Sequence, residues 1–114
     1  MSRVSVEWRD NRETIKHAEH VATLPLFWIT GADISPDGRT LVLTNKQEAF
    51  QYSKTEDGLS WTEFLLNNPE PTCILNLNEE EQREAIAITE EGIWTTSECK
   101  DNPPCPLWFY PNEV

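Results

Sequence analysis

The chain has 114 residues, of which 38% are hydrophobic and 10% aromatic, and this composition predicts one folded domain rather than a disordered polyanion. Its 20 acidic and 9 basic residues give a net charge of −11, which disfavours binding to phosphate backbones and anionic lipid headgroups. We therefore expect no nucleic-acid partner. Because no run approaches the ~20 apolar residues that cross a bilayer, we also expect a soluble chain without membrane insertion.

Short alternating strands are predicted along most of the chain. Val4, Val6 and Trp8 alternate with polar residues, and the polar stretch 9–20 then interrupts the pattern. No segment has the periodicity of a convincing helix. Further strands are expected at 26–34, 39–44, 48–53, 61–66, 73–77, 84–89, 93–97 and 107–110.

The turn signals between these runs predict an antiparallel meander. Residues 35–38 read Ser-Pro-Asp-Gly, in which proline presets the second position and glycine accepts the left-handed conformation. Asp57-Gly58 is a weaker turn signal, and the two prolines of 67–71 indicate a loop.

An internal repeat relates two parts of the chain. Residues 32–38 (ADISPDG) match residues 86–92 (IAITEEG) at an offset of 54 residues. Further on, 50–52 (FQY) is echoed by 108–110 (WFY). A repeat of ~50 residues with about four strands is typical of a β-propeller blade. A plain β-sandwich explains the alternation but not the repeat.

The predicted fold is therefore all-β, with the antiparallel four-stranded blades of a partial β-propeller. Residues 1–28 would supply a loop and outer strands of a preceding blade, 29–77 a complete blade, and 78–114 most of a following blade. Small residues such as Gly31 and Ala85 suit the crowded innermost strands. Because even four blades of ~50 residues exceed the chain, we expect further blades or copies of the chain itself to complete the ring.

The segment 34–43 (ISPDGRTLVL) resembles the repeat of TolB-type β-propellers, in which a Ser-Pro-Asp-Gly turn joins the innermost strand to the next. Residues 30–35, 84–88 and 95–98 look like a group of mostly uncharacterised secreted propeller proteins, and 84–88 is also similar to phytase-esterase-like propellers. Ala85 replaces the glycine of the Glu-Gly-Ile-Ala motif of the latter, so no catalytic residue is carried over. The resemblance implies a propeller and an extracellular location, but no activity.

Three carboxylates are candidate ligand-binding residues. Asp33 and Glu84 fall on predicted innermost strands, where they would face the central channel, and Glu98 ends the following strand. Asp33 and Glu84 are also candidate metal ligands, because converging oxygen atoms suit Ca²⁺. The alternative is that Asp33 accepts hydrogen bonds from backbone amides at its turn while Glu84 and Glu98 are solvated.

The tryptophans have two alternative roles, because buried indoles fill a core while exposed ones stack on sugar rings. Trp28, Trp61, Trp94 and Trp108 all fall in predicted strands with apolar neighbours, so we expect them to be buried. An exposed tryptophan beside a carboxylate would instead favour sugar binding.

Two of the three cysteines are candidates for a disulfide. Cys99 and Cys105 bracket a polar loop with two prolines, whose ends a disulfide would join. The alternative is a pair of free thiols in a reducing compartment. Cys73 has no predicted partner within the chain.

The leading functional hypothesis is a non-enzymatic binding or scaffold module, with a small-molecule, sugar or Ca²⁺ site at the channel mouth. One alternative is a phosphoesterase-like propeller hydrolase, for which 9 basic residues are few. The other is a small lectin-like protein that completes its propeller by oligomerisation.

Overall fold

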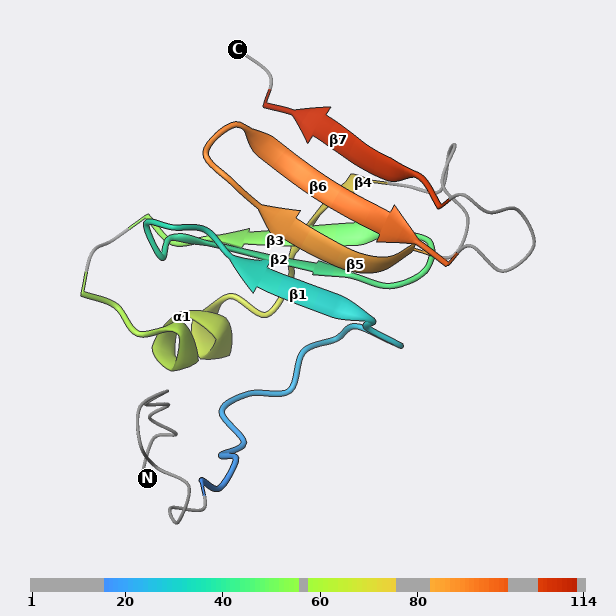
Figure 1. Ribbon diagram of the computed structural model, residues 1–114. Helices are drawn as coiled ribbons and strands as arrows, with labels where there is room; N and C mark the ends of the chain where they lie inside the picture. Colours follow the sequence, from blue (N-terminus) through green and yellow to red (C-terminus); the bar gives the residue numbers. More distant parts are fainter. Residues whose placement is uncertain (1–15, 56–57, 76–82, 99–104, 113–114) are drawn as a thin grey trace.

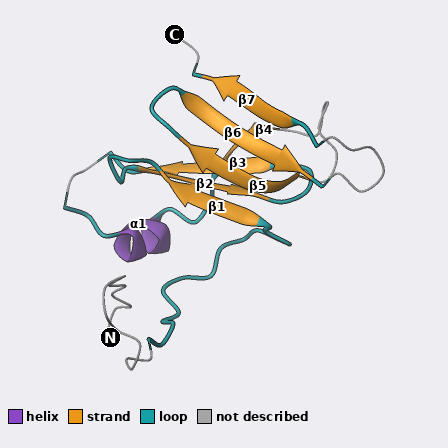
Figure 2. Ribbon diagram, in the orientation of Figure 1, coloured by secondary structure: helices purple, strands orange, loops and turns teal. Residues whose placement is uncertain are grey.

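The computed structural model describes residues 16–55, 58–75, 83–98 and 105–112, which form two antiparallel sheets and one short helix (Figure 1; Figure 2). The four-stranded sheet has the order β1 (Gly31–Ile34), β2 (Thr40–Thr44), β3 (Ala49–Ser53) and β4 (Thr72–Leu75). The three-stranded sheet has the order β5 (Arg83–Ile88), β6 (Gly92–Ser97) and β7 (Leu107–Pro111). Helix α1 (Trp61–Asn67) lies between β3 and β4 in the sequence. The predicted predominance of antiparallel β-structure is confirmed.

The turn between β1 and β2 forms at the predicted residues. Gly38 has a φ of 76°, and its N–H donates to the carbonyl oxygen of Ser35 at 2.8 Å. Oδ1 of Asp37 accepts hydrogen bonds from the Ser35 hydroxyl at 2.6 Å and the Arg39 N–H at 2.9 Å. These bonds, the one from Ser35 first, stabilise the charged carboxylate and lower the pKa of Asp37.

The two copies of the internal repeat occupy the same place in their sheets. Residues 32–38 include the end of β1 and the turn to β2, and residues 86–92 include the end of β5 and the turn to β6. The echoed segments 50–52 and 108–110 lie in β3 and β7, the third strand of each sheet. The sequence repeat therefore corresponds to the same strand connectivity in both sheets.

The two sheets meet along β1 and β5, which run in the same direction. Near the start of both strands, the Thr30 hydroxyl donates to the carbonyl oxygen of Arg83 at 3.0 Å. At the other end, the Ile88 N–H donates to Oδ2 of Asp33 at 2.9 Å. These bonds connect residues 53 and 55 positions apart in the sequence, and they join the beginnings and the ends of the two strands, respectively.

A small apolar core lies between the sheets. Gly31 allows their close approach, because a Cβ atom there would lie only 3.3 Å from the Cα of Ala85. The buried members of this core are Val42, Ala49 and Ile86, around which Ile74, Leu75, Ile88 and Ile93 are packed.

The opposite face of the four-stranded sheet is covered by α1 and the segment that precedes β1 (Figure 1). Described residues 16–28 contain no strand. The buried side chains of this second core are Leu43, Tyr52 and Leu65, and around them pack Ala22, Leu24, Leu26, Ile29, Leu41, Trp61 and Phe64. The chain itself therefore closes this sheet face.

Helix α1 corrects the prediction of a strand at 61–66. Ser60 and Glu63 form the Ser-x-x-Glu signature of a helix start, and the Ser60 hydroxyl accepts a hydrogen bond from the Glu63 N–H at 3.1 Å. Trp61, Phe64 and Leu65 pack in the same core at positions i, i+3 and i+4, which is the spacing of one helix face, whereas Leu66 is exposed. Over the residues that the structure describes, no helix has the length and apolar character needed to cross a membrane.

Ser60→Ala should lower the free energy of unfolding by about 1 kcal/mol, because the Glu63 N–H loses its acceptor. Urea titration followed by far-ultraviolet circular dichroism measures the change. Ser60→Asp keeps an acceptor at the cap and serves as the control, with near wild-type stability expected. An unchanged midpoint for Ser60→Ala would show that the cap does not stabilise the fold.

Candidate functional site

Trp28 corrects two predictions, since it lies outside any strand and is 90% exposed. Strand β1 begins only at Gly31, because the backbone of Trp28 has a φ of 55° and cannot continue an extended strand. This left-handed conformation costs a non-glycine residue roughly 1–2 kcal/mol. Strained residues cluster at functional sites, so the backbone and the exposure both make Trp28 a candidate binding residue.

Trp61, Trp94 and Trp108 are more covered than Trp28. Trp61 lies in α1, where its indole N–H donates to the carbonyl oxygen of Gly38 at 3.2 Å and Lys54 Nζ lies 4.7 Å from the ring centroid. Trp108 is half-buried in β7. Trp94 is 36% exposed in β6, so the expected burial fails for Trp94 as well as for Trp28.

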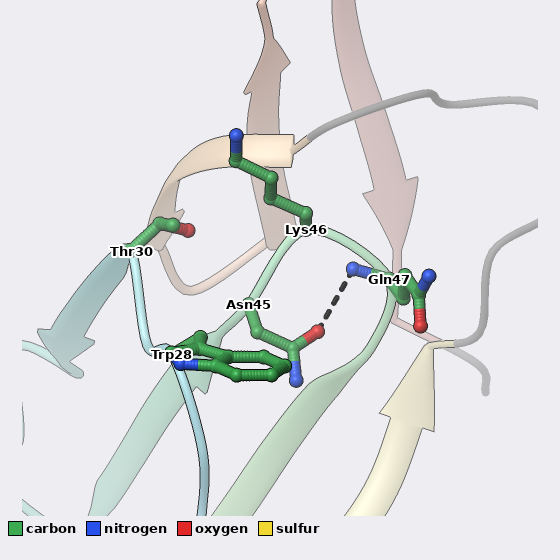
Figure 3. A pocket seen from close by; sticks show the side chains of 5 residues that line it. All are labelled: Trp28, Thr30, Asn45, Lys46 and Gln47. Atoms are coloured by element: carbon green, nitrogen blue, oxygen red, sulfur yellow. Dashed lines mark hydrogen bonds between the residues drawn. The ribbon is translucent and has the colours of Figure 1, made fainter.

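Trp28 lines a hollow of about 380 Å³ with Thr30, Asn45, Lys46 and Gln47 (Figure 3). The hollow is formed by the segment before β1 and by the loop between β2 and β3. The carbonyl oxygen of Lys46 accepts a hydrogen bond of 3.3 Å from the N–H of Arg83, the first residue of β5. The hollow therefore lies where the two sheets meet, at the end where β1 and β5 begin.

Asn45 fixes the shape of the loop between β2 and β3. Its Oδ1 accepts hydrogen bonds from the backbone N–H groups of Gln47 at 2.8 Å and Glu48 at 2.6 Å. Over the described part of the chain, the Asn45 Nδ2 and the Gln47 side chain make no hydrogen bond. Both amides line the hollow, so they are available to hydrogen-bond a ligand.

A second hollow, of about 410 Å³, shares Trp28, Asn45 and Gln47 with the first. Its lining adds a second exposed aromatic ring, Phe27, and the carboxylate-bearing Glu70. The two hollows thus form one region around the indole, with aromatic and amide groups at its centre and acidic groups at its edge.

Tyr52 fixes the loop that carries Glu70. Its hydroxyl donates to the carbonyl oxygen of Pro69 at 2.7 Å. Burial, and secondarily the negative charge of Glu70, raise the pKa of Tyr52, because both disfavour the phenolate. The neutral hydroxyl therefore keeps this hydrogen bond over the neutral pH range.

Two of the three predicted site carboxylates lie beside the hollow. The ammonium group of Lys46 lies 3.4 Å from Oε1 of Glu84 and 3.9 Å from Oε2 of Glu98. Lys46 therefore brings these two side chains together, although both ion pairs are partly exposed and contribute little to stability.

Asp33 lies at the other end of the sheet junction. It accepts a backbone amide hydrogen bond, as the alternative interpretation expects, but from Ile88 of the other sheet rather than from its own turn. Since Glu84 precedes Ile88 by four strand positions, Asp33 and Glu84 are separated by roughly 13 Å along β5. These two residues alone do not assemble the expected Ca²⁺ site, and no group of three or more His, Cys, Asp or Glu suited to a metal occurs among the described residues.

The predicted disulfide involves Cys99, which lies outside the described residues, so the bridge to Cys105 stays a prediction. Cys73 is an exposed cysteine that lines the second hollow. Its Sγ lies 3.9 Å from Oε2 of Glu48.

Comparisons of the chain with protein-family models, with curated proteins and with solved structures find no match. The candidate site is therefore assigned from its geometry alone. Sequence reasoning missed residues 45–47, although Asn45 carries a recognisable signal: an asparagine between two strands commonly folds back onto the amides two and three residues later.

Proposed function

We propose that the chain is a partial β-propeller in which the four-stranded and three-stranded sheets are two adjacent blades. The innermost strands would be β1 and β5, which run in the same direction and meet along their length. The repeat of 32–38 at 86–92 and the resemblance of 34–43 to TolB-type propellers support this assignment. The sheets fall within the predicted blade boundaries 29–77 and 78–114.

We further propose that the module binds a neutral sugar at the hollow beside Trp28, which would lie at the channel mouth. The observation that carries the proposal is an indole 90% exposed and held at a φ of 55°. Its flat apolar face suits the C–H groups of a sugar ring, and the amides of Asn45 and Gln47 suit the hydroxyl groups. A concave site with few polar groups is typical of small-molecule binding.

The charge around the two hollows further restricts the chemical class of the ligand. Glu48 and Glu70 line the second hollow, Glu84 and Glu98 engage Lys46, and the chain carries a net charge of −11. This field repels anions, so acidic sugars and phosphate esters are disfavoured. The same argument disfavours the phosphoesterase alternative, because among the described residues that line the first hollow Lys46 is the one cation, and two carboxylates already engage it.

Trp28→Gly tests the site while respecting its backbone. Because glycine accepts positive φ, this variant should be more stable than the wild type by up to ~1 kcal/mol, yet it should lose the stacking surface. We expect the wild type to bind members of an array of neutral glycans, and the affinity for the best of them to fall at least about tenfold, equivalent to ~1.4 kcal/mol, in Trp28→Gly.

Trp28→Phe is the matched control, since it keeps an aromatic face and should retain most of the binding. Calorimetric titration with the best array glycan measures all three proteins. No binding to any neutral glycan would overturn the proposed site, and so would equal affinities of the wild type and Trp28→Gly.

A further inference from the structure

One face of the three-stranded sheet carries six uncharged side chains that are exposed to solvent. Strand register aligns them in two rows across β5, β6 and β7, with the same orientation in each row. We call this set the outer face; its members are Ala85, Thr96 and Leu107 in one row and Ala87, Trp94 and Phe109 in the other.

The outer face is mostly apolar and contains a pair of aromatic rings. The ring centroids of Trp94 and Phe109 lie 4.6 Å apart, with exposed fractions of 36% and 38%, and Leu107 is 62% exposed. The opposite face of the same sheet is buried in the core through Ile86. A sheet with one packed and one open apolar face indicates an interaction surface.

The four-stranded sheet also has one face turned away from the core between the sheets, and the chain covers that face with its own residues. Helix α1 and the segment before β1 pack over the buried side chains of Leu43 and Tyr52. Within the described residues, a copy of the chain therefore cannot place its outer face on the four-stranded sheet of the next copy. Two copies can instead join identical faces about a two-fold axis, which closes the assembly at a dimer.

We propose that two copies of this chain pair through the outer faces of their three-stranded sheets. The outer face is a surface on which two copies that each carry −11 can meet without bringing like charges into contact, because its six residues are uncharged. Three glutamates next to strands β5 and β6 do not belong to the outer face. They are Glu90 and Glu91 in the turn between β5 and β6, and Glu98 after β6.

The size of the outer face predicts a weak dimer. Six side chains of this kind would bury on the order of 500 Å² of accessible surface per copy. The total over both copies is then close to ~1,000 Å², the lower end of the range for specific interfaces. We therefore expect a dissociation constant on the order of 10 μM. Salt should strengthen the dimer, because it screens the repulsion between two acidic chains.

Sedimentation equilibrium of the full chain tests the proposal at protein concentrations from ~5 to ~500 μM, a range that brackets a weak interface. Measurements at ~50 and ~300 mM NaCl test the salt dependence. A reductant is present throughout, since the exposed thiol of Cys73 would otherwise form covalent dimers. The expected result is a reversible dimer that is tighter at the higher salt concentration.

Two variants assign the dimer to the outer face. Leu107→Glu and Thr96→Glu each place a like charge in the contact and should raise the dissociation constant at least about tenfold. Leu66→Glu is the matched control, because it adds the same charge at an exposed leucine of α1 outside the outer face and should leave the dimer unchanged. Having two variants guards against a fold defect in one, which circular dichroism would reveal.

A wild-type chain that stays monomeric at the highest protein and salt concentrations would overturn the proposal. Dimerisation equally strong in the wild type and in both folded outer-face variants would also overturn it. Neither result bears on the Trp28 site, whose test measures glycan affinity.

Discussion

Gly92→Ala should lower the free energy of unfolding by about 3 kcal/mol or more, a large share of the ~5–15 kcal/mol that stabilises an ordinary domain. Gly92 is buried at the start of β6 with a φ of 156°. A Cβ atom there would collide with the carbonyl oxygen of Tyr110 and lie 2.9 Å from the Cα of Pro111. Both are backbone atoms of β7, so the clash can be relieved only by moving a paired strand.

Gly38→Ala is the matched control for this prediction. Gly38 occupies the equivalent turn of the four-stranded sheet with a φ of 76°, but a Cβ atom there would meet nothing within 4 Å. It should therefore lose only the roughly 1–2 kcal/mol of the unfavourable backbone conformation. Urea unfolding followed by tryptophan fluorescence compares the two variants. Equal losses would show that the contact with β7 does not decide the stability.

Comparison of Gly38 with Gly92 illustrates which features of the fold can be predicted from the sequence. The turn at 35–38 forms as expected because proline, aspartate and glycine impose it locally. Strand β2 (Thr40–Thr44) and strand β7 (Leu107–Pro111) lie close to their predicted ranges, since turns bound the apolar runs there. The tight contact of Gly92 with β7 depends on strand pairing, and nothing in the turn sequence predicts it.

Prediction fails where contacts distant in sequence decide the conformation. The segment 61–66 is rich enough in apolar residues to resemble a strand, but the Ser60 cap and the packing of Leu65 on the sheet make it helical. Residues 26–30 begin with a continuous apolar run that resembles a strand, yet the positive φ at Trp28 takes the chain out of the sheet. A positive φ is rarely encoded by tryptophan, so no local pattern indicates it.

The difference between local signals and contacts distant in sequence also applies to the candidate binding site beside Trp28. Its carboxylates are predicted from their positions on or beside the expected innermost strands, and Lys46 brings only Glu84 and Glu98 together. The hollow beside Trp28 needs the loop at 45–47, which lies at least 17 residues further along the chain and is aligned by the register of β1 with β2. Only the folded sheet places these side chains around one cavity.

Ile86→Ala should lower the free energy of unfolding by about 2–4 kcal/mol, because it leaves a cavity in the small core between the sheets. Ile86 belongs to β5, whereas its buried neighbours Val42 and Ala49 belong to the four-stranded sheet. The variant should therefore weaken both sheets together. Hydrogen exchange measures this, and amides of β2 and β3 should lose protection along with those of β5 and β6.

Ile34→Ala removes the same atoms from β1 at a side chain that is 45% exposed, and it should cost less than about 1 kcal/mol. Loss of protection confined to the three-stranded sheet in Ile86→Ala would contradict the prediction. It would mean that the two sheets are stable independently, with the contacts of Thr30 with Arg83 and of Asp33 with Ile88 contributing little. Joint loss would instead indicate that β1 and β5 join one cooperative unit, as adjacent blades of a propeller require.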